Sequence, residues 1–198
     1  ITKYEKNKEY PIYTRKYMNL DADEEILLDV NDLAKDYDYY QISGISISPD
    51  NKKMAFGVDT LSRRIYTIKV KDLSTGEMYP DKIDGVNSYT TWAADSKTMF
   101  YTGKDEQTLR SDRIFRHSLG ENQDDDTLVY EEKDETFSTF VYPSKSREYI
   151  MIGSSSTMST EYRFLSSKTP LDPFKIIQKR ERGLEYSPSH VGDMFYIS

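Results

Sequence analysis

The chain has 198 residues, of which 36% are hydrophobic, and a formal net charge of −7. This content suffices for the core of one domain, and the negative balance excludes the clustered positive surface of a nucleic-acid-binding protein. The absence of Cys excludes disulfides, thiolate catalysis and Cys-based metal sites. No apolar run is long enough to cross a membrane, and no signal-peptide pattern opens the chain.

The apolar residues predict a chain built mainly of strands. They are dominated by 17 Tyr and 8 Phe, and aromatic side chains fit the pleated, half-buried surface of a sheet. Only Glu24–Lys35 has a helix-like pattern, and within it Glu25–Leu28 also fits a short strand that is followed by a turn around Asn31. We therefore expect an all-β fold.

Turn-forming runs such as Pro49-Asp50-Asn51 and Ser74-Thr75-Gly76 divide the chain into short predicted strands. In chain order these strands are Thr2–Glu5, Tyr10–Lys16, Glu25–Leu28, Ile42–Ser48, Lys53–Val58, Arg64–Lys71, Met78–Ile83, Thr90–Trp92, Thr98–Thr102, Arg113–Ser118, Thr127–Glu131, Ser138–Tyr142, Glu148–Gly153, Glu161–Leu165, Phe174–Gln178, Leu184–Ser187 and Asp193–Ser198.

One local pattern returns four times: a β-rich run, a polar turn and a second β-rich run. Aligning Met54, Met99, Tyr149 and Met194 gives steps of 45, 50 and 45 residues. A period of this size with four strands per unit is typical of β-propeller blades. We therefore predict a fragment of a β-propeller, with about three full four-stranded blades and two partial ones. The expected boundaries are a partial blade at 1–33, blades at about 42–83, 88–132 and 138–181, and a partial blade at 184–198.

The incomplete first and last blades have two consequences. We expect the sequence to be part of a longer protein, because joining the two ends into a fourth blade would leave five strands for four places. The unpaired strand edges of the partial blades also predict self-association, since such edges tend to pair with other chains.

Motifs with catalytic or metal-binding chemistry are weak. Gly44–Ser48 resembles a serine nucleophile elbow, but it lacks the second Gly and lies within a predicted strand. Gly153–Thr157 resembles a phosphate loop only in composition, and Asp124–Asp126 lacks the alternating ligands and Gly of a calcium loop. His117 and His190 have no second ligand at metal spacing, which favours a strand-surface and a turn histidine. No catalytic residue, cofactor or metal site is therefore predicted.

Successive strands of a blade run antiparallel, which sorts the connections into two rims. The loops between strands two and three share one rim with the blade-to-blade connections, and function is often carried by such loops. The acidic run Glu131–Glu135 falls on this rim, where carboxylates would attract cationic ligands. The alternative is a charged connector that only keeps the protein soluble.

A set of motifs carries a family resemblance, in order and with matching spacing over nearly the whole chain. The motifs are Glu9–Tyr13, Glu25–Asp29, Ser48–Asn51, Asp59–Arg64, Lys71–Glu77, Leu128–Asp134 and Ser155–Glu161. Ser48–Asn51 alone recurs in many propellers, whereas the ordered set is specific. Together they resemble the oligopeptidase B group of the prolyl oligopeptidase family of serine peptidases.

This resemblance implies a seven-bladed propeller that covers a C-terminal α/β-hydrolase domain of the same protein. It also implies cleavage of short peptides after Arg or Lys by a Ser-Asp-His triad in that domain, outside this chain, while the propeller admits peptides and excludes folded proteins. In related peptidases the rim that bears the two-to-three loops faces the active site. By this analogy the substrate-facing or interdomain candidates are Asp59, Arg63, Arg64, Asp105, Glu132 and Asp134.

Two other functions remain alternatives, because propellers serve many roles. One is a free-standing scaffold that binds proteins or peptides without catalysis. The other is a carbohydrate-binding propeller, for which Tyr37, Tyr39 and Tyr40 would form the exposed aromatic patch. The lack of Cys and the habits of the family favour the cytoplasm over the periplasm.

Overall fold

The computed structural model describes residues 1–105 and 107–198 and shows an all-β chain, as predicted. The elements are β1 (Thr2–Lys3), β2 (Ile12–Lys16), β3 (Glu24–Asp29), α1 (Val30–Leu33), β4 (Gln41–Ile47), β5 (Lys53–Asp59), β6 (Tyr66–Asp72), β7 (Met78–Trp92), β8 (Thr98–Lys104), β9 (Ser111–Ser118), the 3₁₀ turn η1 (Gln123–Asp125), β10 (Thr127–Glu131), β11 (Ser138–Pro143), β12 (Tyr149–Ser155), β13 (Thr160–Ser166), β14 (Lys175–Gln178), β15 (Pro188–Val191) and β16 (Met194–Ile197). The chain divides into two units, Ile1–Ile42 with Asp59–Arg64, and Ser43–Val58 with Ile65–Ser198.

The first unit contains an antiparallel sheet in the order β1-β2-β3, followed by the single helical turn α1. The sequence of Glu24–Lys35 fitted either a helix or a short strand followed by a turn, and the structure contains a strand and a helical turn. Strand β3 ends at Asp29, and Asp29 caps α1. The carboxylate of Asp29 accepts a hydrogen bond of 2.9 Å from the backbone N–H of Asn31. Such a cap satisfies a donor that the helix itself leaves unpaired.

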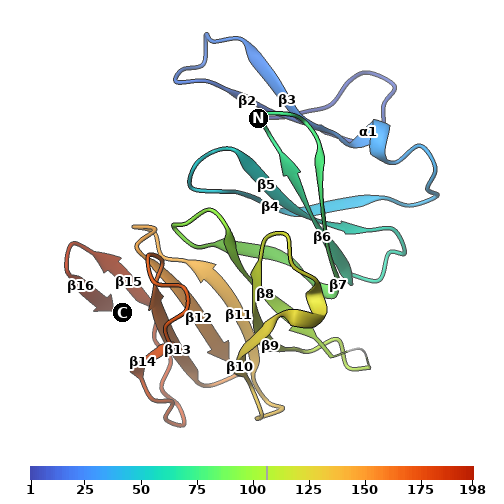
Figure 1. Ribbon diagram of the computed structural model, residues 1–198. Coiled ribbons are helices and arrows are strands. Elements are labelled where there is room, and N and C mark those ends of the chain that lie inside the picture. Colours follow the sequence, from blue (N-terminus) through green and yellow to red (C-terminus); the bar gives the residue numbers. More distant parts are fainter. Residues whose placement is uncertain (106) are drawn as a thin grey trace. The chain divides into compact units, whose positions relative to one another are not determined.

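The second unit contains a seven-stranded sheet in the order β10-β9-β8-β7-β6-β5-β4 (Figure 1). Its long strand β7 pairs with β6 along its first part and with β8 at its end. The sequence predicted two strands here, Met78–Ile83 and Thr90–Trp92, with a break between them. In the structure one strand spans that break, with Gly85 at φ 75° inside it, so the last strand of one blade continues into the first strand of the next.

A four-stranded sheet in the order β11-β12-β13-β14 and the hairpin β15-β16 follow. Strand β11 packs against β7, β8 and β9 of the preceding sheet. The apolar cluster between these sheets includes Phe100, Ile114, Val141, Ile150 and Ile152. Consecutive residues of β12 are buried because both faces of this strand are covered, as in other sheets enclosed between layers.

The last predicted blade begins later than expected. Leu184–Ser187 was predicted as its first strand, but β15 starts at Pro188, a residue that a strand tolerates at its first position. Of the preceding residues, Ser187 exchanges both backbone hydrogen bonds with Ser198, whereas Leu184 and Tyr186 are tied to β13. The backbone N–H of Thr160 donates to the carbonyl oxygen of Leu184 at 3.0 Å, and the N–H of Tyr186 donates to Oγ1 of Thr160 at 2.9 Å.

The interpretation of the two histidines as surface or turn residues is wrong. His190 is 5% exposed in strand β15, and His117 is 1% exposed in β9. Nδ1 of His117 lies 2.7 Å from Oδ1 of Asp126, and its Nε2 lies 2.9 Å from Oδ1 of Asp81. Burial lowers the pKa of His117, but the hydrogen bonds to Asp126 and Asp81 outweigh it, so this pKa lies above its ordinary value of 6.5.

The buried triad of His117, Asp81 and Asp126 should make stability depend on pH. The protonated ring donates to both carboxylates, so its contribution should be complete below the ordinary His pKa of about 6.5. It should be lost as the pH rises through the raised pKa of His117. Urea unfolding of His117→Gln at pH 6 should show a free energy of unfolding lower by about 3 kcal/mol, because a buried ion pair loses a partner.

The matched control is His190→Gln, which replaces a buried histidine that no carboxylate hydrogen-bonds among the residues described. This variant should keep the decline of stability between pH 6 and 9, whereas His117→Gln should lack it. The same decline in wild type and His117→Gln would contradict the triad.

Candidate functional site

Four connections of the second unit lie at the same ends of their strands and form what we call the loop rim. They are residues 105 and 107–110 after β8, 132–137 after β10, 156–159 after β12 and 179–187 after β14. Arg110 joins the first two connections, because its Nη1 donates to the carbonyl oxygens of Glu132 at 3.2 Å, Asp134 at 3.3 Å and Phe137 at 3.0 Å. The blade-to-blade and two-to-three loops therefore meet, as the strand count predicted.

A buried network of ion pairs lies under the loop rim. Nη2 of Arg180 is 2.6 Å from Oε2 of Glu132 and 3.2 Å from Oε1 of Glu161, and both carboxylates are 4% exposed. Glu161 also pairs with Nη2 of Arg163 at 2.5 Å, and the hydroxyl of Tyr130 donates to Oε2 of Glu132 at 2.6 Å. Two strands, β10 and β13, and two connections thus share one charged cluster.

Aromatic rings complete this cluster. The guanidinium carbon of Arg180 lies 4.0 Å from the centre of the Phe137 ring, and that of Arg163 lies 4.2 Å from the centre of the Tyr130 ring. Such contacts add an attraction between the cation and the ring and are stronger where water is excluded. The network therefore fixes both arginines in place.

The network favours the charged form of its acids. Burial raises the pKa of Glu132, but the hydrogen bonds from Arg180 and Tyr130 outweigh it, so this pKa lies below its ordinary value of 4.5. The pKa of Glu161 also lies below its ordinary value of 4.5. Burial raises this pKa, but the hydrogen bond from the backbone N–H of Arg180 and the positive charge of Arg163 lower it by more. Arg180 stays a cation, because its hydrogen bonds to the two acids raise its pKa although burial lowers it.

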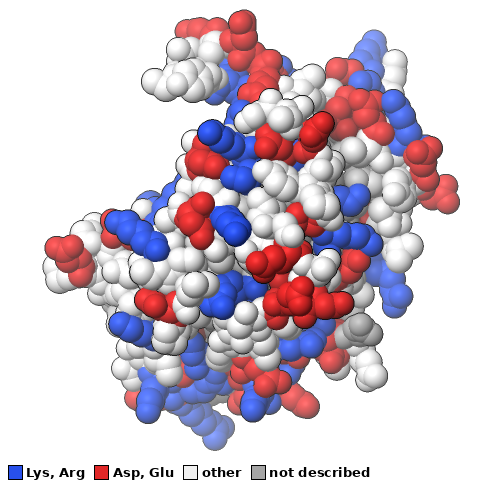
Figure 2. Space-filling view, viewed as in Figure 1, with Lys and Arg blue, Asp and Glu red and all other residues white. Residues whose placement is uncertain are grey.

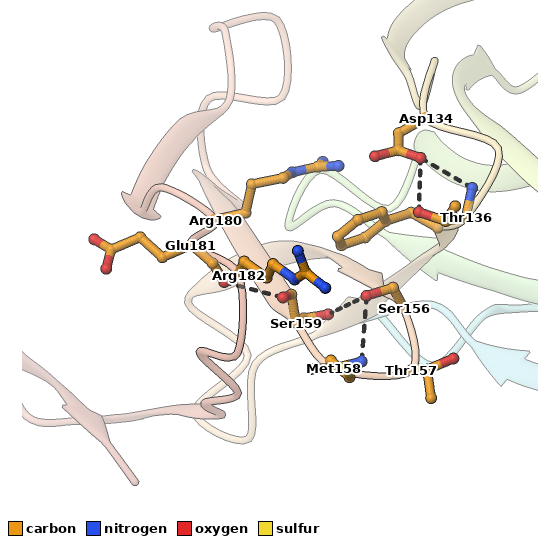
Figure 3. A pocket seen from close by; sticks show the side chains of 10 residues that line it. Asp134, Thr136, Ser156, Thr157, Met158, Ser159, Arg180, Glu181 and Arg182 are labelled. Atoms are coloured by element: carbon orange, nitrogen blue, oxygen red, sulfur yellow. Dashed lines mark hydrogen bonds between the residues drawn. The ribbon is translucent and has the colours of Figure 1, made fainter.

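A cavity of about 480 Å³ opens on the loop rim above this network (Figure 3). Its lining comes from three connections and combines apolar with charged groups, including Asp134, Phe137, Met158, Arg180 and Arg182. Phe137 is buried, whereas Met158 is exposed. A volume of this size lies within the range of sites that bind small ligands. The mixture of ring, thioether and charged groups suits a peptide side chain.

The structure brings three of the six predicted residues together on the loop rim. Glu132 is held in the ion network, and Asp134 is exposed and accepts hydrogen bonds from the N–H of Thr136 at 3.0 Å and from its hydroxyl at 2.7 Å. Asp105 shapes its own turn, with its carboxylate accepting from the N–H groups of Gln107 at 3.1 Å and Thr108 at 2.7 Å. Of these carboxylates, only Glu132 is buried.

The other three predicted residues lie in the first unit. Asp59 is 1% exposed, and its carboxylate accepts hydrogen bonds of 2.8 Å from the N–H groups of Leu61 and Arg64. Its side chain thereby closes the loop after β5, while the side chains of Arg63 and Arg64 are exposed. Whether any of the six contacts a substrate or a second domain stays a prediction.

Sequence reasoning missed Arg180 and Glu161, which hold the network. The available signal was the placement of residues 179–183 on the same rim as Glu132, since a buried acid requires a cation nearby. Arg110 was missed for a different reason. It acts through backbone carbonyl groups, which no sequence pattern marks.

Other chemistry has little support in the described part of the chain. No group of three or more His, Cys, Asp or Glu side chains among residues 1–105 and 107–198 is arranged to hold a metal ion. Oγ of Ser146 lies 2.9 Å from Nδ1 of His190, but this pair has no carboxylate as a third member among the described residues. Within the same residues, no helix has the length and apolarity needed to span a bilayer.

Comparisons with known proteins agree with this fold. The family described as prolyl oligopeptidase, N-terminal beta-propeller domain, matches residues 1–198. Dipeptidyl aminopeptidase BI of Pseudoxanthomonas mexicana is 40% identical over 176 residues, which cover 89% of this chain and 24% of that protein. Protease 2 of Moraxella lacunata is 35% identical over 203 residues, covering 99% of this chain and 29% of that protein.

Solved structures give the same result. Oligopeptidase B from Leishmania major superposes with a TM-score of 0.91 at 30% identity, over 99% of this chain and 28% of that one. Oligopeptidase B from Trypanosoma brucei, in a closed form with covalently bound antipain, gives a TM-score of 0.86 at 26% identity, over 97% of this chain and 27% of that one. This chain spans less than a third of the length of these relatives. It belongs to the prolyl oligopeptidase family and corresponds to the N-terminal β-propeller domain of these peptidases.

Proposed function

We propose that this chain is the propeller part of a serine oligopeptidase that cleaves short peptides after Arg or Lys. Its loop rim faces an α/β-hydrolase domain of the same protein and receives the peptide. The family match over residues 1–198 and the likeness to oligopeptidase B support this proposal. The observation that carries it is the buried network of Glu132, Arg180 and Glu161, because it holds loops of successive blades in one fixed surface.

A fixed surface is what a size filter requires. A filter that excludes folded proteins must keep its opening narrow, so the loops around it must resist separation. Arg180 ties the connection after β14 to Glu132 after β10, and Arg110 ties the connection after β8 to that same segment. The rim therefore has cross-links that do not depend on a second domain.

Surface charge supports a preference for basic peptides. Arg180 and Arg163 balance Glu132 and Glu161, so the remaining charged groups of the cavity lining are the exposed side chains of Asp134, Glu181 and Arg182, with a net charge of −1. Figure 2 shows acidic and basic side chains interspersed over the viewed face. Attraction of a basic peptide therefore depends on the individual carboxylates nearest to it. An exposed carboxylate attracts a cationic side chain, and this attraction weakens as the salt concentration rises.

The ion network should stabilise the chain at neutral pH and lose its effect in acid. Because the pKa values of Glu132 and Glu161 are lowered, their contribution is complete above the ordinary value of 4.5 and falls as the pH drops through the lowered values. Glu132→Gln should reduce the free energy of unfolding at pH 7 by about 2 kcal/mol in urea titrations.

The matched control is Glu131→Gln, an exposed neighbour whose carboxylate lies 3.8 Å from Nζ of Lys133. Exposed pairs contribute little, so this variant should stay within about 0.5 kcal/mol of wild type. Equal stability of the two variants at pH 7 would contradict the network.

Reversing the charge at the loop rim should weaken cleavage of basic peptides by the full-length protein. Asp134→Lys should lower kcat/KM for a short Arg-containing peptide by about two- to fivefold at low salt, a size typical of one exposed charge. The loss should shrink as salt is added, because salt screens exposed charges.

The control for this experiment is Asp124→Lys, which makes the same change of charge in η1, at the opposite ends of the strands. It should leave kcat/KM within twofold of wild type. If both variants behave alike, or if the effect of Asp134→Lys does not depend on salt, the rim does not attract basic peptides. Full-length protein without peptidase activity would reject the proposed function itself.

A further inference from the structure

A second cavity lies among the turns opposite the loop rim. It has a volume of about 390 Å³ and is formed by β4, the end of β7 and the turn between β11 and β12. Its apolar lining includes Ile45, Ile47, Trp92 and Tyr149. All of these residues belong to the second unit. We call this cavity the turn cleft.

Arg147 is the one charged residue of the turn cleft among the residues described. It adopts φ 62°, a conformation that few non-Gly residues occupy, because the turn fixes its backbone. Its N–H donates to the carbonyl oxygen of Ser144 at 2.8 Å, and its own carbonyl oxygen accepts from Oγ of Ser167 at 3.0 Å. Arg147 is exposed, and its guanidinium has no hydrogen bond or ion pair within the described chain. The turn thus presents an unneutralised cation at the edge of an apolar cleft.

This combination selects the chemistry of a ligand. A guanidinium binds a carboxylate with two parallel hydrogen bonds, and the apolar lining favours a hydrocarbon side chain close to that carboxylate. Ser46 and Thr91 also belong to the lining of the cleft, and each carries a hydroxyl group of a kind that bonds to peptide groups. The volume lies near the lower end of the range for ligand sites, which suits two or three residues.

We propose that the turn cleft binds the C-terminal end of a short peptide whose last side chain is apolar. The terminal carboxylate pairs with Arg147, and the last side chain packs between Ile45, Trp92 and Tyr149. The neighbouring acid Glu148 does not line the cleft, so no carboxylate of the lining competes for Arg147 among the described residues. This site is separate from the loop rim and does not depend on the function proposed for it.

Trp92 gives a direct reading of this site. It is the single Trp of the chain, it lines the cleft, and its Nε1 donates to the carbonyl oxygen of Ser46 at 3.2 Å. The test titrates the 198-residue chain with N-acetyl-Ala-Leu-Leu and with the same peptide as its C-terminal amide, and follows the Trp fluorescence. The acid should bind about tenfold more tightly than the amide, equivalent to about 1.4 kcal/mol. Equal affinities of acid and amide would overturn the proposal, as would the absence of any response to the acid at millimolar concentration.

Two variants test whether binding of the acid depends on Arg147 itself or on any positive charge of the turn. Arg147→Asn removes the guanidinium, and Asn tolerates the φ of this turn, so the fold should be kept. It should reduce the affinity for the acid to that for the amide. Lys145→Ala removes a cation of the same turn that does not line the cleft, and it should stay within twofold of wild type. An equal loss in both variants would overturn the proposal.

A third ligand, octanoate, tests whether the turn cleft recognises a peptide or any carboxylate that carries a hydrocarbon chain. Octanoate has the carboxylate and the hydrocarbon but no peptide groups for Ser46 and Thr91. It should bind at least about fivefold more weakly than the peptide acid, because each lost polar bond reduces affinity. Tighter binding of octanoate would assign the cleft to an acyl chain and overturn the peptide proposal.

Discussion

Buried charge must be neutralised, and this constraint organises the loop rim. Glu132 and Glu161 are each 4% exposed, so both need a cation that is also withdrawn from water. Arg180 meets the need of both acids, and it belongs to a connection that follows β14, 48 residues from Glu132. Because these charges come from successive blades, neutralising them positions the loops of one blade against those of the next.

At the other ends of the strands, successive blades are joined by different contacts. There the backbone N–H of Asp50 donates to Oγ of Ser96 at 3.0 Å, and the N–H of Ala94 donates to the carbonyl oxygen of Ser167 at 2.9 Å. These bonds use neutral groups, so they impose no demand for a countercharge. The guanidinium of Arg147 can therefore remain available at that end, whereas Arg180 at the loop rim cannot.

Much of the fold could be predicted because its signals are local. Turn residues such as Pro49 and Gly76 and alternating strand patterns placed most strands within about two residues of their observed bounds. The misplaced start of β15 and the continuous strand β7 both depend on which neighbour pairs with the backbone. The triad of His117 was not predicted for a related reason, since its partner Asp81 lies 36 residues away on another strand.

The sequence predicted which loops form the candidate site, but not the contacts between their side chains. Counting strands placed the acidic run Glu131–Glu135 and the blade-to-blade connection 179–183 on the same rim, and the structure brings Glu132 and Arg180 from these segments into contact. Burial divides the predicted acids into two kinds. Asp59 and Glu132 are buried and shape their surroundings, whereas Asp134 is exposed at the cavity. Burial of this kind is set by packing between blades, which a single sequence does not display.

The proposed function requires that the loop rim is the surface that receives the peptide. Hydrogen–deuterium exchange of the full-length protein, with and without an uncleavable Arg-containing peptide, tests this directly. We expect slower exchange in residues 132–137 and 179–183 when the peptide is bound, with little change in the turn around Asp124. Unchanged exchange in both rim segments, with the peptide bound, would contradict the proposed function.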